Sequence, residues 1–211
     1  MVQFLLISHV LAGSIAIVSA FSAISTKKGS KNHIFLGRIY SLAMLYVVVG
    51  ALALSILRPN PFLFAIALFS GYFVWTGFRR ARYKNAKLNK VDTFTVFAGF
   101  LIVFLLLGYG SFVLISGDSI GIVLLFFGIG LIIFTVEDFF ALTKETYKAK
   151  FRIANHLQRM LGGTIATITA VLVQQLVPRI QNTQIPELII WIGPTLVLTP
   201  LITYWSKKIL Q

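Results

Sequence analysis

The sequence predicts an all-α integral membrane protein, a bundle of seven transmembrane helices forming a single domain over residues 1–211. Two observations predict this class. Hydrophobic residues make up 57% of the chain and charged residues only 12%, with a mean hydropathy of +0.87, outside the range of soluble globular domains. Long stretches also lack any charged residue, and about 20 consecutive apolar residues are needed to cross the hydrocarbon core of a bilayer.

Five uncharged runs predict five spans directly, and two shorter runs complete the set. The predicted helices cover approximately residues 3–25, 39–57, 61–78, 93–116, 119–142, 160–177 and 188–205. Only helices or closed barrels satisfy every backbone polar group in lipid, and these runs lack the alternation of barrel strands. The first run lacks the basic n-region of a signal peptide, so we expect it to belong to the bundle. Pro194 and Pro200 fall inside the last run, which we expect them to kink or interrupt.

The positive charges fix an expected orientation. Seventeen of the nineteen Lys and Arg residues fall on one side, in the connections 27–38, 79–90 and 144–159 and in the tail at 207–208. The other two, Arg58 and Arg179, fall on the opposite side. Because basic loops are retained in the cytoplasm, the pattern predicts an outside N-terminus and a cytoplasmic C-terminus. The longest polar segment, residues 143–159, is expected to extend a helix or to lie along the inner interface.

The net charge of +13 comes mainly from the basic residues of these connections. Their charge is also expected to attract anionic lipids at the cytoplasmic face of the bilayer. Nucleic-acid binding is not expected, because the basic residues are spread among membrane loops rather than gathered on a soluble module. The chain has no Cys, which excludes disulfides and Cys-ligated zinc or iron–sulfur clusters. A homo-oligomer or a partner in a membrane complex stays open.

Ionisable residues near the inner ends of the predicted spans form one candidate site. They are His33 and Arg38 at the second span, Glu137 and Asp138 at the fifth, and His156 and Arg159 at the sixth. Adjacent helical residues diverge by about 100 degrees, so one of Glu137 and Asp138 should face the bundle and the other the interface. Three interpretations stay open: a structural clamp in which a carboxylate pairs with Arg38 or Arg159, a divalent metal or haem site, and a proton-handling site.

A second candidate group is predicted at the outer side, where His9 and Gln174 lie at similar depth. A histidine there should face the bundle interior. It is compatible with a neutral imidazole bonded to a neighbouring helix, a haem or metal ligand, a proton relay, or a contact to a quinone-type head group. His9 and His33 are each followed four residues later by glycine, which would leave a notch beside the imidazole for a flat group or for another helix.

Two segments carry a resemblance. The stretch from His33 to Tyr40 reads H-x3-G-R-x-Y, and His156 begins an H-x2-R-M segment that continues into a run of Gly, Ala and Thr. Together they resemble a bacterial family of multi-pass membrane proteins, a domain of unknown function, over about the first forty-five residues and residues 137–174. The resemblance implies a bacterial inner membrane but no activity. Its recognisable features correspond here to His33, Asp138, His156, Arg159 and Met160.

No P-loop, G-x-S-x-G, H-E-x-x-H or dinucleotide fingerprint is present, so enzymatic activity is left undecided. Three functions stay open: a redox or metal-dependent protein with His33 and His156 as ligands, a small-solute or ion transporter using His9, Gln174 and Asp138, and a structural or assembly subunit. The sequence slightly favours a functional site around His33, Asp138 and His156, where versatile groups gather in an otherwise apolar chain.

Overall fold

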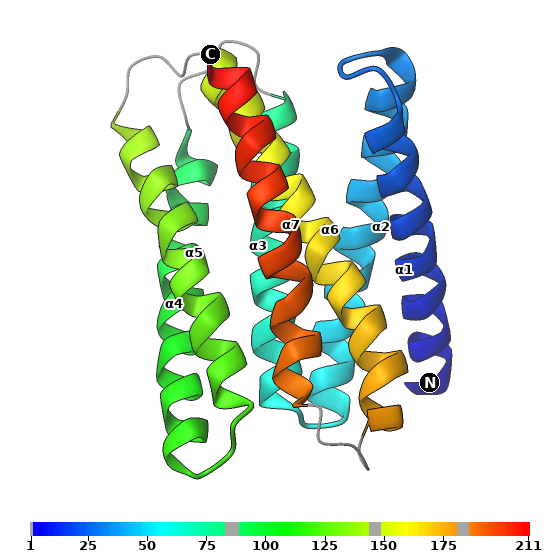
Figure 1. Ribbon diagram of the computed structural model, residues 1–211, viewed down its shortest axis with the longest axis vertical. Helices are drawn as coiled ribbons and strands as arrows, with labels where there is room; N and C mark the ends of the chain where they lie inside the picture. The colour runs from blue at the N-terminus through cyan, green and yellow to red at the C-terminus, as the bar shows by residue number, and fades with distance from the viewer. Residues whose placement is uncertain (1, 83–88, 144–148, 181–185) are drawn as a thin grey trace. The chain divides into compact units, whose positions relative to one another are not determined.

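The computed structural model describes residues 2–82, 89–143, 149–180 and 186–211. These residues form seven helices: α1 (Val2–Ser25), α2 (Lys31–Leu57), α3 (Pro61–Arg82), α4 (Lys90–Ile115), α5 (Gly121–Leu142), α6 (Ala149–Ile180) and α7 (Glu187–Leu210) (Figure 1). Each is long and apolar enough to cross a membrane, which confirms an all-helical fold with seven helices capable of spanning a bilayer. The orientation across the membrane stays a prediction, and the predicted cytoplasmic lysines at 84, 87, 144 and 148 lie outside the described residues.

Several helices extend further than their apolar runs. The second, fourth and sixth begin at Lys31, Lys90 and Ala149, ahead of the predicted starts at 39, 93 and 160. An uncharged run marks only the part of a helix that lies in hydrocarbon, whereas a polar cap sets where the helix begins. The Ser30 hydroxyl, for example, accepts a hydrogen bond from the His33 backbone N–H at 3.2 Å. The expectation that segment 143–159 extends a helix is confirmed from Ala149 onward.

The prolines do not interrupt the last helix. The α7 helix is continuous from Glu187 to Leu210 through Pro194 and Pro200, so of the two expected outcomes the interruption does not occur and the kink stays a prediction. A proline removes only one helical hydrogen bond, and a transmembrane helix tolerates this when nearby groups satisfy the freed carbonyl.

The chain groups into two compact units, Met1–Trp75 and Thr76–Gln211, with the boundary inside α3. In the first unit, α1 packs against α2 (Figure 1). The buried face of α1 carries only small side chains, Ala16, Ser19, Ala20 and Ala23, whose three- and four-residue spacing allows close approach. The assignment of all 211 residues to a single domain stays a prediction.

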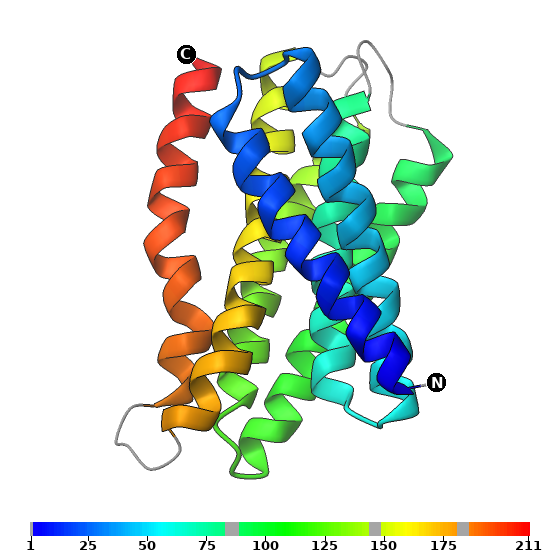
Figure 2. The same ribbon diagram turned by 90° about the vertical axis from the view of Figure 1, so that its right-hand side faces the viewer.

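In the second unit, α4 packs against α5, and α7 packs against both α6 and α5 (Figures 1 and 2). Glycines bring α4 and α5 together: a Cβ on Gly121 would lie 2.5 Å from the Gly110 carbonyl oxygen, and one on Gly128 would lie 2.7 Å from the side chain of Leu107. By contrast, a Cβ on Gly108 or Gly130 would meet nothing within 4 Å. In the α4–α5 hairpin, Gly121 and Gly128 therefore lie where the two helices touch, whereas Gly108 and Gly130 do not.

Candidate functional site

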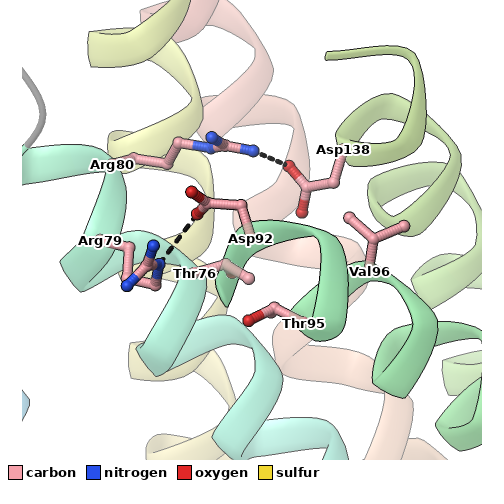
Figure 3. A pocket seen from close by; sticks show the side chains of 7 residues that line it. All are labelled: Thr76, Arg79, Arg80, Asp92, Thr95, Val96 and Asp138. Carbon is pink, nitrogen blue, oxygen red and sulfur yellow. Dashed lines mark hydrogen bonds and ion pairs between the residues drawn. The ribbon is translucent and has the colours of Figure 1, made fainter. Parts of the chain in front are cut away.

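Two adjacent arginines at the end of α3 reach two different helices. Arg80 Nη2 donates to Asp138 Oδ1 of α5 at 2.7 Å, and Arg79 Nε donates to Asp92 Oδ1 of α4 at 2.8 Å (Figure 3). Neighbouring residues on a helix point about 100 degrees apart, so one turn of α3 can contact both partners. We call the end of the second unit that holds these contacts the basic end.

Asp138 is the centre of the contacts at the basic end. Its Oδ1 also accepts from Arg159 Nη2 of α6 at 2.8 Å, so one carboxylate joins α3, α5 and α6. Asp138 is 1% exposed and Arg159 is 0% exposed. The interpretation of Arg159 as a salt-bridge partner is therefore confirmed. We refer to Arg80, Asp138 and Arg159 as the arginine–aspartate network.

Glu137 lies at the edge of this network. Its side chain is 38% exposed, and its Oε2 accepts from Arg159 Nη2 at 3.2 Å. The divergence of the two neighbouring acids is confirmed, with Asp138 buried and Glu137 partly in contact with the surroundings. The Arg159 guanidinium also lies 5.3 Å from the centroid of the Phe134 ring, a favourable cation–π arrangement.

Asp92 fastens the start of α4 to α3. Its Oδ2 accepts the backbone N–H of Asn89 at 2.9 Å, while the Asn89 side chain accepts the backbone N–H groups of Val91 and Asp92, which forms a capping box. Arg79 donates to both Asp92 and Asn89. The same residues thus cap α4 and attach it to the neighbouring helix.

His156, Arg159 and Met160, the residues of the H-x2-R-M segment, all meet Gly77 of α3. The His156 Nδ1 lies 2.9 Å from the Gly77 carbonyl oxygen, and because a carbonyl only accepts, Nδ1 carries the proton of this bond. A Cβ on Gly77 would lie 2.9 Å from Met160 Sδ and 3.2 Å from Arg159 Cβ. Glycine at 77 therefore leaves room for the Arg159 and Met160 side chains of α6 to pack against α3.

His33 makes a similar contact within the first unit. Its Nδ1 lies 3.0 Å from the carbonyl oxygen of Ala23, near the end of α1, which also accepts from the Thr26 hydroxyl at 2.8 Å. Arg38 is exposed on α2 of the same unit. Since His33 and Arg38 belong to the first unit, their convergence with Asp138 and His156 stays a prediction.

The two residues predicted at the outer side, His9 and Gln174, also belong to different units. His9 is half-buried in α1, with its Nδ1 beside Gly50 of α2, where an added Cβ would lie 3.2 Å away. Gln174 is exposed on α6. A Cβ on Gly13 or on Gly37 would meet nothing within 4 Å, so neither of these glycines admits a neighbouring helix in the described structure.

No group of three His, Asp or Glu side chains that could hold a metal ion occurs among the described residues. Asp138 is instead engaged by two guanidiniums, and each inner histidine donates to a backbone carbonyl. A metal or haem site thus gains no support from this geometry.

Sequence reasoning missed Gly77, Arg79, Arg80 and Asp92. The two arginines follow an apolar run directly and were counted only as orientation charges. Two signals point to their roles: Asn89-x-x-Asp92 has the spacing of a capping box, and the chain has only six acidic residues against nineteen Lys and Arg, so a buried acid has many cationic candidates.

The opposite end of the second unit carries a different feature. A depression of about 300 Å³ lies between the start of α5 and the start of α7, and its lining includes Asp118 and Glu187.

Comparisons with protein-family models, with curated proteins and with solved structures find no match to this chain.

Proposed function

We propose that this chain is a multi-pass protein of the bacterial inner membrane that transports a small polar solute, with the arginine–aspartate network as a latch at the cytoplasmic ends of α3, α5 and α6. The observation that carries the proposal is the Asp138 carboxylate, 1% exposed and bonded by guanidiniums from two other helices at 2.7 and 2.8 Å. The predicted cytoplasmic side rests on the distribution of basic residues.

The first argument for a latch is the cost of burying charge. Removing an ion from water costs several kcal/mol, and replacing a buried ion pair by apolar residues of similar volume is often neutral or stabilising. A contact that only fastened helices together would therefore gain little from being ionic. Charged residues within membrane segments are instead typical of solute and ion pathways.

The second argument is where the ion pairs lie. Each of the four described pairs joins two different helices, and all four lie at the basic end of the second unit. The depression beside Asp118 and Glu187 lies at the other end. Closure by separable contacts at one end and a hollow at the other are typical of a transporter that opens its two sides alternately.

Permeation through liposomes tests this proposal. Purified wild type, Asp138→Asn and Arg58→Gln would be reconstituted at equal density, and swelling would be followed by stopped-flow light scattering in gradients of glycerol, urea and sodium acetate. We expect Asp138→Asn to change the permeation of at least one of these solutes several-fold, because the neutral amide no longer holds two guanidiniums. Arg58→Gln, which also neutralises one charge but at the exposed end of α2 in the first unit, should behave as wild type.

Equal permeation of all three solutes by wild-type and folded Asp138→Asn protein would contradict the transport proposal. If Asp138→Asn does not fold, Arg80→Lys provides a milder change, because it keeps the charge and loses the planar guanidinium. Loss of folding in both variants would instead favour a structural or assembly subunit.

A further inference from the structure

Most of the positive charge at the basic end of the second unit has no acid beside it. Each of the three acids described at this end forms an ion pair with Arg79, Arg80 or Arg159. The other six cations described there have no acidic partner among the described residues: Arg82, Lys90, Lys150, Arg152, Lys207 and Lys208. Their charge is therefore available to an anion that comes from outside the described chain.

Three of these cations gather where α6 begins and α7 ends. Lys150 Nζ donates to the backbone carbonyl oxygen of Gln211 at 2.8 Å, so the first turn of α6 lies against the last turn of α7 (Figures 1 and 2). Lys207 and Lys208 belong to that last turn, and all three lysine side chains are exposed. A helix C-terminus carries only about half a negative elementary charge, which three ammonium groups exceed. We call Lys150, Lys207 and Lys208 the lysine corner.

An exposed apolar stripe on α7 leads away from the lysine corner. Its members are Val197, Leu201 and Tyr204, and all three side chains are exposed. Successive spacings of four, three and four residues connect Val197 to Lys208, so the stripe and this lysine share one helix face. At 1.5 Å per residue the distance from Val197 to Lys208 is roughly 16 Å, about half the thickness of the hydrocarbon core. The stripe therefore matches the depth of one lipid leaflet.

We propose that the lysine corner binds the phosphate of an anionic phospholipid, with an acyl chain of the same lipid along the α7 stripe. Lysine binds phosphate as a point charge, and its long stem lets the ammonium reach the headgroup layer while the methylenes stay against apolar surface. Basic residues in general attract a diffuse excess of anionic lipids. Here the stripe adds a second contact, which fixes one lipid in one position. The proposal is independent of whether the protein transports a solute.

Native mass spectrometry of detergent-purified protein tests the proposal. Wild type would be incubated with equal amounts of phosphatidylglycerol and phosphatidylcholine that carry identical acyl chains. We expect several-fold more retained phosphatidylglycerol than phosphatidylcholine, and a ratio near one for the double variant Lys207→Gln with Lys208→Gln. The matched control, Lys27→Gln with Lys31→Gln, also removes two exposed charges on the same predicted side, but at the start of α2 in the first unit, and should keep the wild-type ratio.

Two results would overturn the proposal: a wild-type ratio of one, or an equal fall of the ratio in both double variants. Inorganic phosphate distinguishes a lipid from a free anion. We expect that phosphate at the concentration of the lipid leaves the retained phosphatidylglycerol in place, whereas displacement would mean that the acyl chain contributes nothing and would also overturn the proposal. If the double variant at α7 does not fold, Lys208→Gln is compared with Lys31→Gln, with the same expected difference.

Discussion

The two units use the same histidine contact but differ in how they treat charge. In each, an imidazole Nδ1 donates to a backbone carbonyl near the end of another helix, His33 to Ala23 in the first unit and His156 to Gly77 in the second. Among the described residues of the first unit, no ion pair accompanies this contact, whereas the second unit surrounds it with buried arginines and aspartates. The histidine contact is therefore a means of joining helices, and the arginine–aspartate network is the distinctive feature.

The largest expected effect comes from removing the centre of that network. Asp138→Ala leaves Arg80 and Arg159 without their shared carboxylate, and breaking a buried pair in this way costs about 3–5 kcal/mol. We expect a loss of this size in the free energy of unfolding, measured by denaturant titration in detergent. The matched change in the first unit is Ser41→Ala, which removes an equally buried hydroxyl bonded only to its own helix at Gly37.

Ser41→Ala removes one buried hydrogen bond and should cost only about 0.5–1.5 kcal/mol. If the two variants lost similar free energy, the proposed difference between the units would be wrong.

A second effect tests the α4–α5 hairpin. Gly121→Ala places a methyl group 2.5 Å from the Gly110 carbonyl oxygen, a backbone atom that cannot move away by changing rotamer. We expect a loss of about 1–3 kcal/mol in unfolding free energy, typical of overpacking. Gly108→Ala in the same hairpin and Gly13→Ala in the first unit face open space and serve as controls, and a loss in either equal to that of Gly121→Ala would contradict the packing.

A third comparison asks whether the two histidines act alike. Replacing either His33 or His156 by Ala removes one hydrogen bond, so each should lower stability by about 0.5–1.5 kcal/mol. Asn should restore part of the loss, because its amide N–H₂ can donate from a position close to that of Nδ1. A much larger loss at His156, without recovery by Asn, would show that this imidazole belongs to the charged network rather than to helix joining.

The smallest effect is expected at the edge of the network. Glu137→Gln removes a charge whose side chain is 38% exposed and 3.2 Å from Arg159, so the cost should be about 0.2–1 kcal/mol and should shrink at high salt. Unfolding free energies at low and high ionic strength would measure it. A loss of unfolding free energy as large as that of Asp138→Ala would mean that the difference in exposure between Glu137 and Asp138 does not determine how much each contributes to stability.

The sequence was sufficient to predict the seven long apolar helices, because the composition of a membrane helix is set by the hydrocarbon around it. It also predicted that Asp138 and Glu137 diverge, which follows from helical geometry, and it offered Arg38 and Arg159 as alternative salt-bridge partners, of which the structure shows Arg159. Arg80 and Gly77 could not be assigned in this way. Their roles depend on which faces of α3 and α6 meet, a tertiary choice that no local pattern within either helix specifies.

The proposed latch can be tested most directly by sided labelling of a single cysteine. The chain has no native Cys, and Thr135 on α5, one turn from Asp138, is fully buried with a hydroxyl that has no hydrogen-bond partner in the described structure, so Thr135→Cys is a mild reporter. We predict that a membrane-impermeant maleimide, applied from the predicted cytoplasmic side, reacts slowly with this cysteine while Asp138 is intact and much faster in folded protein that also carries Asp138→Asn. Equal slow labelling in both folded proteins would contradict the account.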